Sequence, residues 1–434
     1  MNDQQCVQEL LDFIDASPSP WHAVATMEQT LIKHAFQRLI ETESWGLSAG
    51  KRYYVIRDDS SIIAFVAGTK SLVNHGYKII GAHTDSPGLR IKPHALFKTG
   101  ELLCMGVEVY GGPILATFTD RDLSFAGRLS YQTTTGDIKT KLVRFEQALL
   151  RLPNLAIHMN RTVNEEGLKL NKQSELPLLF ASSAEEQLPE TVFTELLSTQ
   201  SELAAEQILS WEFNVYDTQK GAFWGADQAF YSNSQLDNLA SCHAGLSALL
   251  DKQVLNSGNT VICAFFDHEE VGSESTKGAN GSFLPDTLER IALASDLKPE
   301  EYKRALAQSF MLSVDMAHAY QPNFPAAYEP EHKVYVNKGP VIKLNANQRY
   351  SSETVSEAMF IRWCQQANVP FQKYAHRTDI PCGSTIGPMT SAKLGIRTVD
   401  VGNAMWAMHS IRESAGVLDH RYIIDVMQCF FKSE

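Results

Sequence analysis

Six acidic and histidine residues stand out in this sequence because most of them follow short apolar runs. Two imidazoles and three carboxylates are the ligands that two neighbouring zinc-like ions require, and a fourth carboxylate remains free to move protons. The set therefore predicts a pair of metal ions that carries out hydrolysis. The residues are His83, Asp237, Glu269, Glu270, Asp315 and His409.

Four of the five segments that carry these residues begin with a strand-like apolar run. In an open α/β sheet, ligands collect at the carboxyl ends of the strands. We therefore expect the side chains to converge at one edge of a sheet. The runs are residues 79–80, 261–266, 311–314 and 398–401.

Asp237 and Asp85 each have a structural alternative. Asp237 precedes a helix-like segment, where a carboxylate commonly caps the first-turn amides, although the other four segments favour a ligand. Asp85 lies two residues after His83, so on an extended backbone both side chains face the same side. Its carboxylate is expected to bond the non-ligating nitrogen of His83. Residues 84–88 also suit a capped turn, and the two interpretations are compatible.

Glu269 and Glu270 are adjacent at the end of a predicted buried strand. Two uncompensated carboxylates would be costly there. With a metal pair, one glutamate is a ligand and the other accepts a proton from the water that attacks a carbonyl carbon. A solvated charge pair is the alternative. The neighbouring Asp267 and His268 cannot be told apart from surface polar residues.

Length and composition favour a cytoplasmic protein of two domains. A chain of 434 residues exceeds the usual size of one hydrophobic core. The net charge of −12 and the absence of a basic cluster argue against nucleic acid. The first 20 residues do not resemble a signal peptide, and no apolar stretch suits a membrane. Seven cysteines without a CxxC pair predict reduced thiols and no cysteine metal site.

The pattern of elements predicts an α/β fold with an insert. Helices alternate with apolar strands in the catalytic part, residues 1–93 and 233–434, which indicates a mostly parallel sheet covered by helices. Residues 94–232 have alternating segments that indicate a strand-rich insert. Predicted helices are 6–14, 20–40, 238–250, 299–308, 352–366 and 390–394, and predicted strands are 53–56, 62–66, 77–82, 101–110, 125–131, 155–158, 261–266, 310–314 and 397–401.

Several long motifs, in the same order along nearly the whole chain, resemble those of the M18 metalloaminopeptidases, in particular the aspartyl aminopeptidase group. Motifs of this length in sequence order are highly specific, whereas HTD or EE alone would be weak. They include GAHTDSPGLRIKP (81–93), YGGPILATFTDRDLSFAGRL (110–129), LDNLASC (236–242), DHEEVGSES (267–275), SVDMAHA (313–319), KGPVIKLNANQRY (338–350), PCGSTIGP (381–388) and MHSIRE (408–413).

The resemblance implies a role for each of the six residues. By this resemblance, Asp237 bridges two zinc ions and Glu269 is the general base. Asp85 is placed in the catalytic set for its position two residues after His83. Cobalt or manganese suits the same carboxylate and imidazole donors. The remaining ligands are His83 and Asp315 on one ion, and Glu270 and His409 on the other.

The resemblance also implies an assembly. Members of the family have a catalytic α/β domain interrupted by a dimerisation domain, and they form tetrahedral dodecamers built from dimers. A histidine that matches His158 is donated there to the active site of the neighbouring subunit. From the residues alone, His158 is an ordinary strand residue.

Charge arithmetic indicates how an acidic substrate would bind. Two divalent cations balance the four carboxylates of the predicted site, so an acidic substrate side chain needs a further cation. By resemblance, Lys343 binds it with the assistance of Tyr350, and an exposed strand lysine is the alternative. Two apolar stretches, 113–116 and 404–406, depart from the pattern of many relatives and leave a neutral or broader preference open.

The prediction is a dinuclear zinc aminopeptidase that removes N-terminal residues, acidic ones in particular, from peptide substrates. A zinc amidohydrolase that acts on N-acylated amino acids is a second interpretation, since related folds use nearly the same ligands. A non-catalytic oligomeric scaffold is a third, and the intact ligand set together with Glu269 argues against it.

Overall fold

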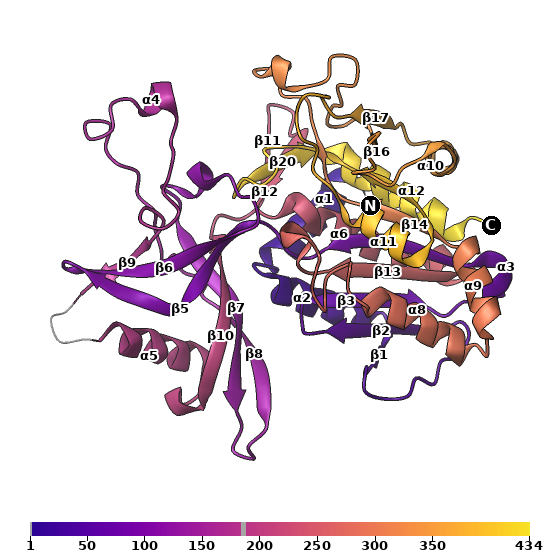
Figure 1. Cartoon of the computed structure of the whole chain (residues 1–434), viewed down its shortest axis with the longest axis horizontal. Helices are drawn as coiled ribbons and strands as arrows, with labels where there is room; N and C mark the ends of the chain where they lie inside the picture. Colours follow the sequence, from indigo (N-terminus) through magenta and orange to yellow (C-terminus); the bar gives the residue numbers. More distant parts are fainter. Residues whose placement is uncertain (1, 184–187) are drawn as a thin grey trace.

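The computed structural model describes residues 2–183 and 188–434. Its strands form sheets of nine, six and five strands. Figure 1 shows the nine-stranded sheet among helices in one part of the molecule, with the six-stranded sheet in a second part beside it. The predicted α/β class, with a sheet covered by helices, is confirmed.

The nine-stranded sheet is mostly parallel, with five parallel and three antiparallel neighbouring pairs. Its four central strands, β13, β4, β14 and β18, are all parallel, so their carboxyl ends meet at one edge. In spatial order the strands are β1 (Gln37–Leu39), β2 (Arg52–Arg57), β3 (Ser61–Val66), β13 (Thr260–Phe266), β4 (Tyr77–His83), β14 (Phe310–Val314), β18 (Arg397–Gly402), β16 (Val341–Leu344) and β17 (Gln372–Ala375).

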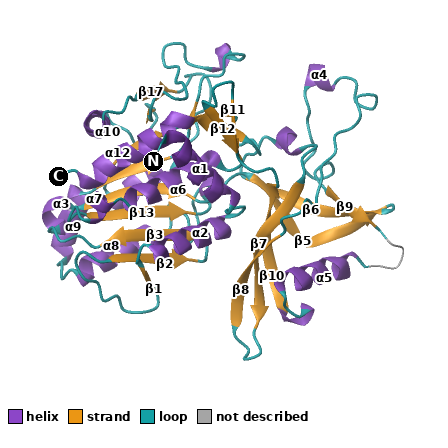
Figure 2. Ribbon diagram, turned by 180° about the vertical axis from the view of Figure 1, so that it is seen from behind, coloured by secondary structure: helices purple, strands orange, loops and turns teal. Residues whose placement is uncertain are grey.

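Helices cover both faces of this sheet (Figure 2). Within β4, Ile80 packs into the core under one group of helices and Ile79 into the core under the other, as the alternation of a strand requires. One group comprises α1 (Asp3–Asp15), α2 (Pro20–Lys33), α6 (Leu236–Leu249), α7 (Lys252–Leu255), α10 (Thr354–Ala367) and α12 (Val417–Lys432). The other comprises α3 (Leu72–His75), α8 (Phe283–Ala294), α9 (Pro299–Gln308) and α11 (Ile386–Leu394).

The six-stranded sheet is antiparallel and has its own apolar core, in which Phe125, Phe193 and Phe213 make ring contacts. Only one residue pair, Asn214 with Arg90, joins β10 to β5, so the sheet has two three-stranded halves. In order it contains β8 (Ile138–Arg144), β7 (Leu123–Gln132), β10 (Ile208–Asp217), β5 (Gly88–Thr99), β6 (Leu102–Tyr110) and β9 (Leu178–Ser182); α5 (Pro189–Ser201) and α4 (Val163–Glu166) accompany it.

This sheet begins at Gly88, before the predicted boundary at residue 94. The division into residues 1–93 and 233–434 around a dimerisation domain of 94–232 stays a prediction. The five-stranded sheet combines two strands from residues 222–233 with three strands from later in the chain. Its strands are β11 (Ala222–Trp224), β12 (Phe230–Asn233), β20 (Glu413–Gly416), β19 (Ala404–Trp406) and β15 (Ala317–His318).

Two predicted elements are wrong. The helix expected over 20–40 ends at Lys33, because Ala35 has a φ of +58° and the chain continues into the edge strand β1. The strand expected over 155–158 is a loop. Asn154, just before it, donates its amide and its side-chain NH₂ to the Asp120 carboxylate, and among the described residues no strand pairs with this segment.

In the described part of the chain, no helix is both long and apolar enough to cross a membrane. All seven cysteines are free thiols, and five of them are buried.

Candidate metal centre

The structure brings the six predicted residues to one edge of the nine-stranded sheet. His83 is the last residue of β4, and Asp315 directly follows the neighbouring strand β14. Glu269 and Glu270 form a short turn just after β13, on the other side of β4. The remaining two are Asp237, in the first turn of α6, and His409, in the loop between β19 and β20.

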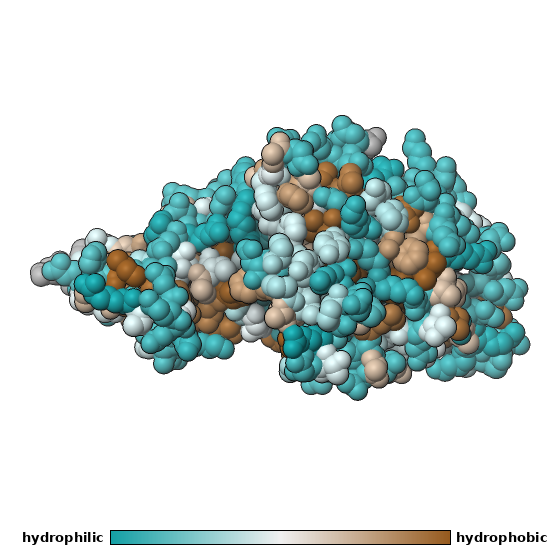
Figure 3. Space-filling model, turned by 90° about the horizontal axis from the view of Figure 1, so that it is seen from above, coloured by the Kyte–Doolittle hydropathy of each residue, from teal (hydrophilic) through white to brown (hydrophobic). Residues whose placement is uncertain are grey.

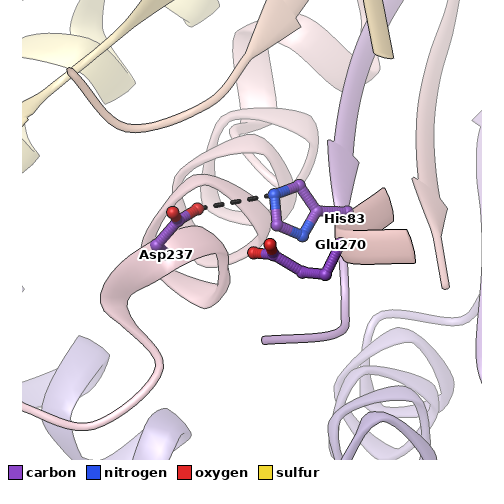
Figure 4. A group of neighbouring side chains, drawn as sticks. All are labelled: His83, Asp237 and Glu270. Atoms are coloured by element: carbon purple, nitrogen blue, oxygen red, sulfur yellow. Dashed lines mark ion pairs between the residues drawn. The ribbon is translucent and has the colours of Figure 1, made fainter. Parts of the chain in front are cut away.

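Asp237 lies between the two histidines. Its Oδ1 is 3.4 Å from His83 Nε2, and its Oδ2 is 3.5 Å from His409 Nε2. Figure 4 shows the carboxylates of Asp237 and Glu270 turned toward the His83 ring. The N-cap of α6 is Gln235, and Asp237 has non-helical φ and ψ of −83° and 100°, so the helix-cap alternative does not describe it. The Asp237–Asn238 peptide bond is cis.

The other two carboxylates extend the cluster on opposite sides of Asp237. Asp315 Oδ1 is 3.6 Å from His83 Nε2, and Glu270 Oε2 is 3.5 Å from His409 Nε2. These separations are too long for good hydrogen bonds. They match the separation of about 3.4 Å between two atoms that share a tetrahedral zinc ion at about 2.1 Å.

Unpartnered atoms give a second test of the fit to a metal. Asp237 Oδ1 and Asp315 Oδ1 are buried oxygens without a hydrogen-bond partner. Leaving a buried charged acceptor unpaired costs free energy that a bound cation would remove. Ligand atoms of His83, Asp237 and Glu270 all lie within 4.8 Å of one another. The donor set and its spacing therefore fit zinc.

The protein alone leaves this cluster with excess negative charge. Burial, and then neighbouring carboxylates such as Asp315, raise the pKa of Glu269 to about 8 against the opposing charge of His83. Burial and the charge of Asp237 likewise raise the pKa of Glu270 well above its ordinary value. The Glu270 side chain is only 5% exposed, so the pair is not a solvated surface pair.

The same carboxylates stabilise the protonated form of both histidines and so raise their pKa values. Burial alone would lower the pKa of His83, but contacts with Asp237, Asp315 and Asp85 raise it well above the ordinary value. Burial also opposes the rise at His409, where the contact with Asp237 raises the pKa to about 9. The cluster therefore favours bound positive charge.

Asp85 organises the glutamate turn more directly than it orients His83. Its Oδ1 accepts the amide of Glu269 and its Oδ2 that of Glu270, each at 3.1 Å. The Tyr110 hydroxyl donates to Oδ2 at 2.7 Å. The closest partner of His83 Nδ1 is the main-chain oxygen of Asp85 at 3.0 Å, whereas the expected carboxylate contact is 3.4 Å. A donating Nδ1–H leaves the Nε2 lone pair free for a ligand bond.

Lys343 is not an exposed strand lysine. It is 2% exposed, and its Nζ donates to Met316 O at 2.9 Å and lies 3.4 Å from Asp315 Oδ2. The Nζ also lies 5.3 Å from the ring centre of Tyr350, which is itself buried. Both residues therefore lie beside one end of the carboxylate cluster.

Sequence reasoning missed two neighbours of the site, one buried and one half-buried. Glu413 accepts main-chain amides from Asp237 and His409, and its one sequence signal is its place four residues after His409. His318 is half-buried near Lys343, and desolvation together with the Lys343 charge lowers its pKa to about 4. Its signal is its position three residues after Asp315, which is too common a spacing to be specific.

His158 lies in the segment between β8 and β9. It is exposed in the loop that replaces the predicted strand 155–158. Within the described residues, it makes no hydrogen bond or ion pair with any of the six.

Comparison with known proteins identifies the family. Residues 13–431 match the family described as Aminopeptidase I zinc metalloprotease (M18). A probable M18 family aminopeptidase 2 of Stutzerimonas stutzeri (strain A1501) is 43% identical over 428 residues, which cover 98% of each chain. One of the same description from Pseudomonas aeruginosa (strain UCBPP-PA14) is 42% identical, with the same coverage.

Solved structures agree along the whole chain. A chain in the cryo-EM structure of the Ape4 and Nbr1 complex is 36% identical, with a TM-score of 0.96 over 99% of this chain and 86% of that one. The S. cerevisiae mApe1 dodecamer is 27% identical, with a TM-score of 0.86 over 98% of this chain and 96% of that one. With a converging set of zinc-type ligands at the edge of the sheet, the chain belongs to the M18 family of zinc metalloproteases and is an aminopeptidase, a metallo-exopeptidase that hydrolyses peptides from the N-terminus.

Proposed function

We propose that this aminopeptidase uses two zinc ions and prefers peptides with an acidic N-terminal residue. The observation that carries the two-ion proposal is the position of Asp237, whose two oxygens face two different histidines at 3.4 and 3.5 Å. One carboxylate that faces two separate imidazoles is the arrangement that a bridging ligand requires. His83 and Asp315 would complete one ion site, and Glu270 and His409 the other.

Bound zinc supplies Lewis-acid chemistry, which polarises a carbonyl group and makes water more acidic. We assign the proton transfers to Glu269. Its carboxylate accepts the proton of the attacking water as the carbon–oxygen bond forms, and returns it to the leaving amine as the carbon–nitrogen bond breaks. The two main-chain amides held by Asp85 fix the turn that carries Glu269. The free α-amine of the substrate binds near Glu269 and Glu270.

Lys343 supports the acidic preference. An ammonium group has three donors, and Lys343 uses one on Met316 O and directs another toward Asp315. The third is available for a substrate carboxylate, and Tyr350 lies beside it. Ala404 and Met405, in one of the two apolar stretches that left a broader preference open, are buried in the fold and do not line the surface.

We also propose that the chain assembles as a dodecamer built from dimers, in which His158 enters the partner's active site. The support is a similar chain solved as a dodecamer, together with exposed apolar residues beside His158. Leu155 and Met159 are 68% and 76% exposed. Figure 3 shows apolar side chains on the narrow end of the molecule, which is the part built on the six-stranded sheet. The free thiols fit the reducing cytoplasm.

The metal-stripped protein is expected to bind two zinc ions per chain, with a rise in melting temperature because buried carboxylates gain a partner. Asp237→Asn should weaken both ions, since Asp237 faces both ligand groups. Asp122→Asn, at a side chain 68% exposed, is the control. Elemental analysis and calorimetric titration measure the stoichiometry. A wild-type protein that saturates with one ion would contradict the two-ion proposal.

Glu269→Gln is expected to keep its zinc and lose about 10²- to 10⁴-fold in kcat, because the amide has a similar shape but cannot accept the proton. Glu274→Gln, at an exposed position of the same loop, should retain activity. Steady-state kinetics are measured together with metal content. Substantial turnover by a zinc-replete Glu269→Gln protein would refute the assignment of the base.

A panel of aminoacyl chromogenic substrates with Asp, Glu, Ala and Leu tests specificity, with a chelator and N-acetylated substrates as controls. Lys343→Met should reduce the preference for Asp over Leu by about 10- to 100-fold, which is the strength of a hydrogen bond to a charged group. Lys338→Met, at an exposed lysine nearby, should leave it unchanged. A wild-type preference for Leu would reject the acidic pocket, and cleavage of acetylated substrates alone would favour the amidohydrolase.

His158→Ala is expected to keep the oligomer intact and to lower kcat/KM, since the partner's site loses a substrate contact. Light scattering gives the mass, and kinetics give the loss. His94→Ala, in the same part of the chain with a side chain 91% exposed, is the control. Full activity of a correctly assembled His158→Ala protein would contradict the role given to His158.

A further inference from the structure

Two of the proposed ligands, His409 and Asp237, have backbone conformations that regular secondary structure does not stabilise. His409 has a φ of +68°, and Ala407, two residues earlier, has a φ of +55°. Residues with a Cβ are strained in this left-handed region and hold it only where surrounding contacts impose it. Asp237 lies in the first turn of α6 with non-helical dihedral angles, so the helix does not fix it either.

One buried carboxylate holds both of these backbones. Glu413 Oε2 accepts the amide of Asp237 at 3.0 Å, and Glu413 Oε1 accepts the amide of His409 at 2.7 Å. Glu413 is the first residue of β20 and is 2% exposed. Among the described residues, no lysine, arginine or histidine forms an ion pair with it. Its two hydrogen-bond partners are therefore main-chain amides.

The two hydrogen bonds that Glu413 accepts, from the amides of Asp237 and His409, form a clamp. This clamp joins segments that are distant in the sequence but adjacent at the site. With their amides held by the two oxygens of one rigid group, Asp237 and His409 keep Oδ2 and Nε2 at 3.5 Å. The His409 carbonyl is held from the other side by the amide of Ile114, and its Nδ1 lies 3.1 Å from Gly112 O. Groups that support metal ligands in this way typically account for about 10- to 100-fold in affinity.

We propose that Glu413 is a positioning residue that sets the zinc affinity of the ion site formed by Asp237, Glu270 and His409. It acts by fixing the backbones of two of the three ligands and does not touch substrate or metal. Asp85 holds the amides of Glu269 and Glu270 in the same manner. The inference rests on the proposed two-ion centre.

Glu413→Gln tests the inference. Glutamine presents one oxygen to one amide, and its NH₂ group must face the other N–H, so half of the clamp is lost. Competition with a chromophoric chelator should show the ion site that contains both Asp237 and His409 weakened by about 10- to 100-fold, and the other site, which shares only Asp237 with the clamp, weakened less. With cobalt in place of zinc, the visible absorption bands of that site should shift because the ligand geometry has changed.

Asp419→Asn is the matched control. Asp419 is also fully buried, and it accepts the amides of Asn337 at 2.5 Å and Gly339 at 2.8 Å, away from the ligands. Both variants lose half of an amide clamp, so both should melt at a lower temperature. Only Glu413→Gln should change metal affinity and the cobalt spectrum. Equal metal affinity in Glu413→Gln and wild type, or an equal loss in Asp419→Asn, would overturn the inference.

Two further measurements separate the possible failures. If Glu413→Gln does not fold, hydrogen exchange on the wild type decides: the amides of Asp237 and His409 must be protected without metal, and rapid exchange overturns the clamp. If the wild type binds a single ion, the two-ion proposal fails. Unchanged affinity of that ion in Glu413→Gln would then overturn the role of Glu413 as well, and a 10- to 100-fold loss would support it.

Discussion

The concentration of negative charge at the edge of the sheet is the constraint on which the rest of the structure depends. Asp237, Glu269, Glu270 and Asp315 converge, with two imidazoles, in a region that is largely shielded from water. Carboxylates this close repel one another and lose hydration, so the arrangement persists only where a rigid framework imposes it and a cation compensates it. The zinc centre of the family supplies that cation.

The framework meets this constraint at two levels. Parallel strands buried on both faces fix the points from which His83, Asp315 and the glutamate turn project. Main-chain amides then hold the surrounding acids, with Asp85 and Glu413 each accepting two. Amide dipoles stabilise these carboxylates without further positive side chains, which would compete with metal for the same ligands. Lys343 is the exception, and it is placed at the Asp315 end.

The strands of the catalytic sheet could be predicted well because a short stretch of sequence marks the end of each one. An apolar run followed by an acid or histidine places that residue at the sheet edge, and β4, β13 and β14 follow this rule. Glu413 escaped prediction because its partners depend on tertiary contacts between distant segments. The alternation at 155–158 was misleading because alternation also occurs in exposed loops, and only a neighbouring strand distinguishes them.

The order of the ligands along the chain has a consequence for biosynthesis. His83 is made early and His409 late, while Asp237, Glu270 and Asp315 emerge between them. Strands β4 and β13 can already pair once residue 266 has been made, whereas one proposed site still lacks Asp315 at that point and the other still lacks Glu270 and His409. The complete set of proposed ligands, which includes His409, is therefore present only after most of the chain has been synthesised.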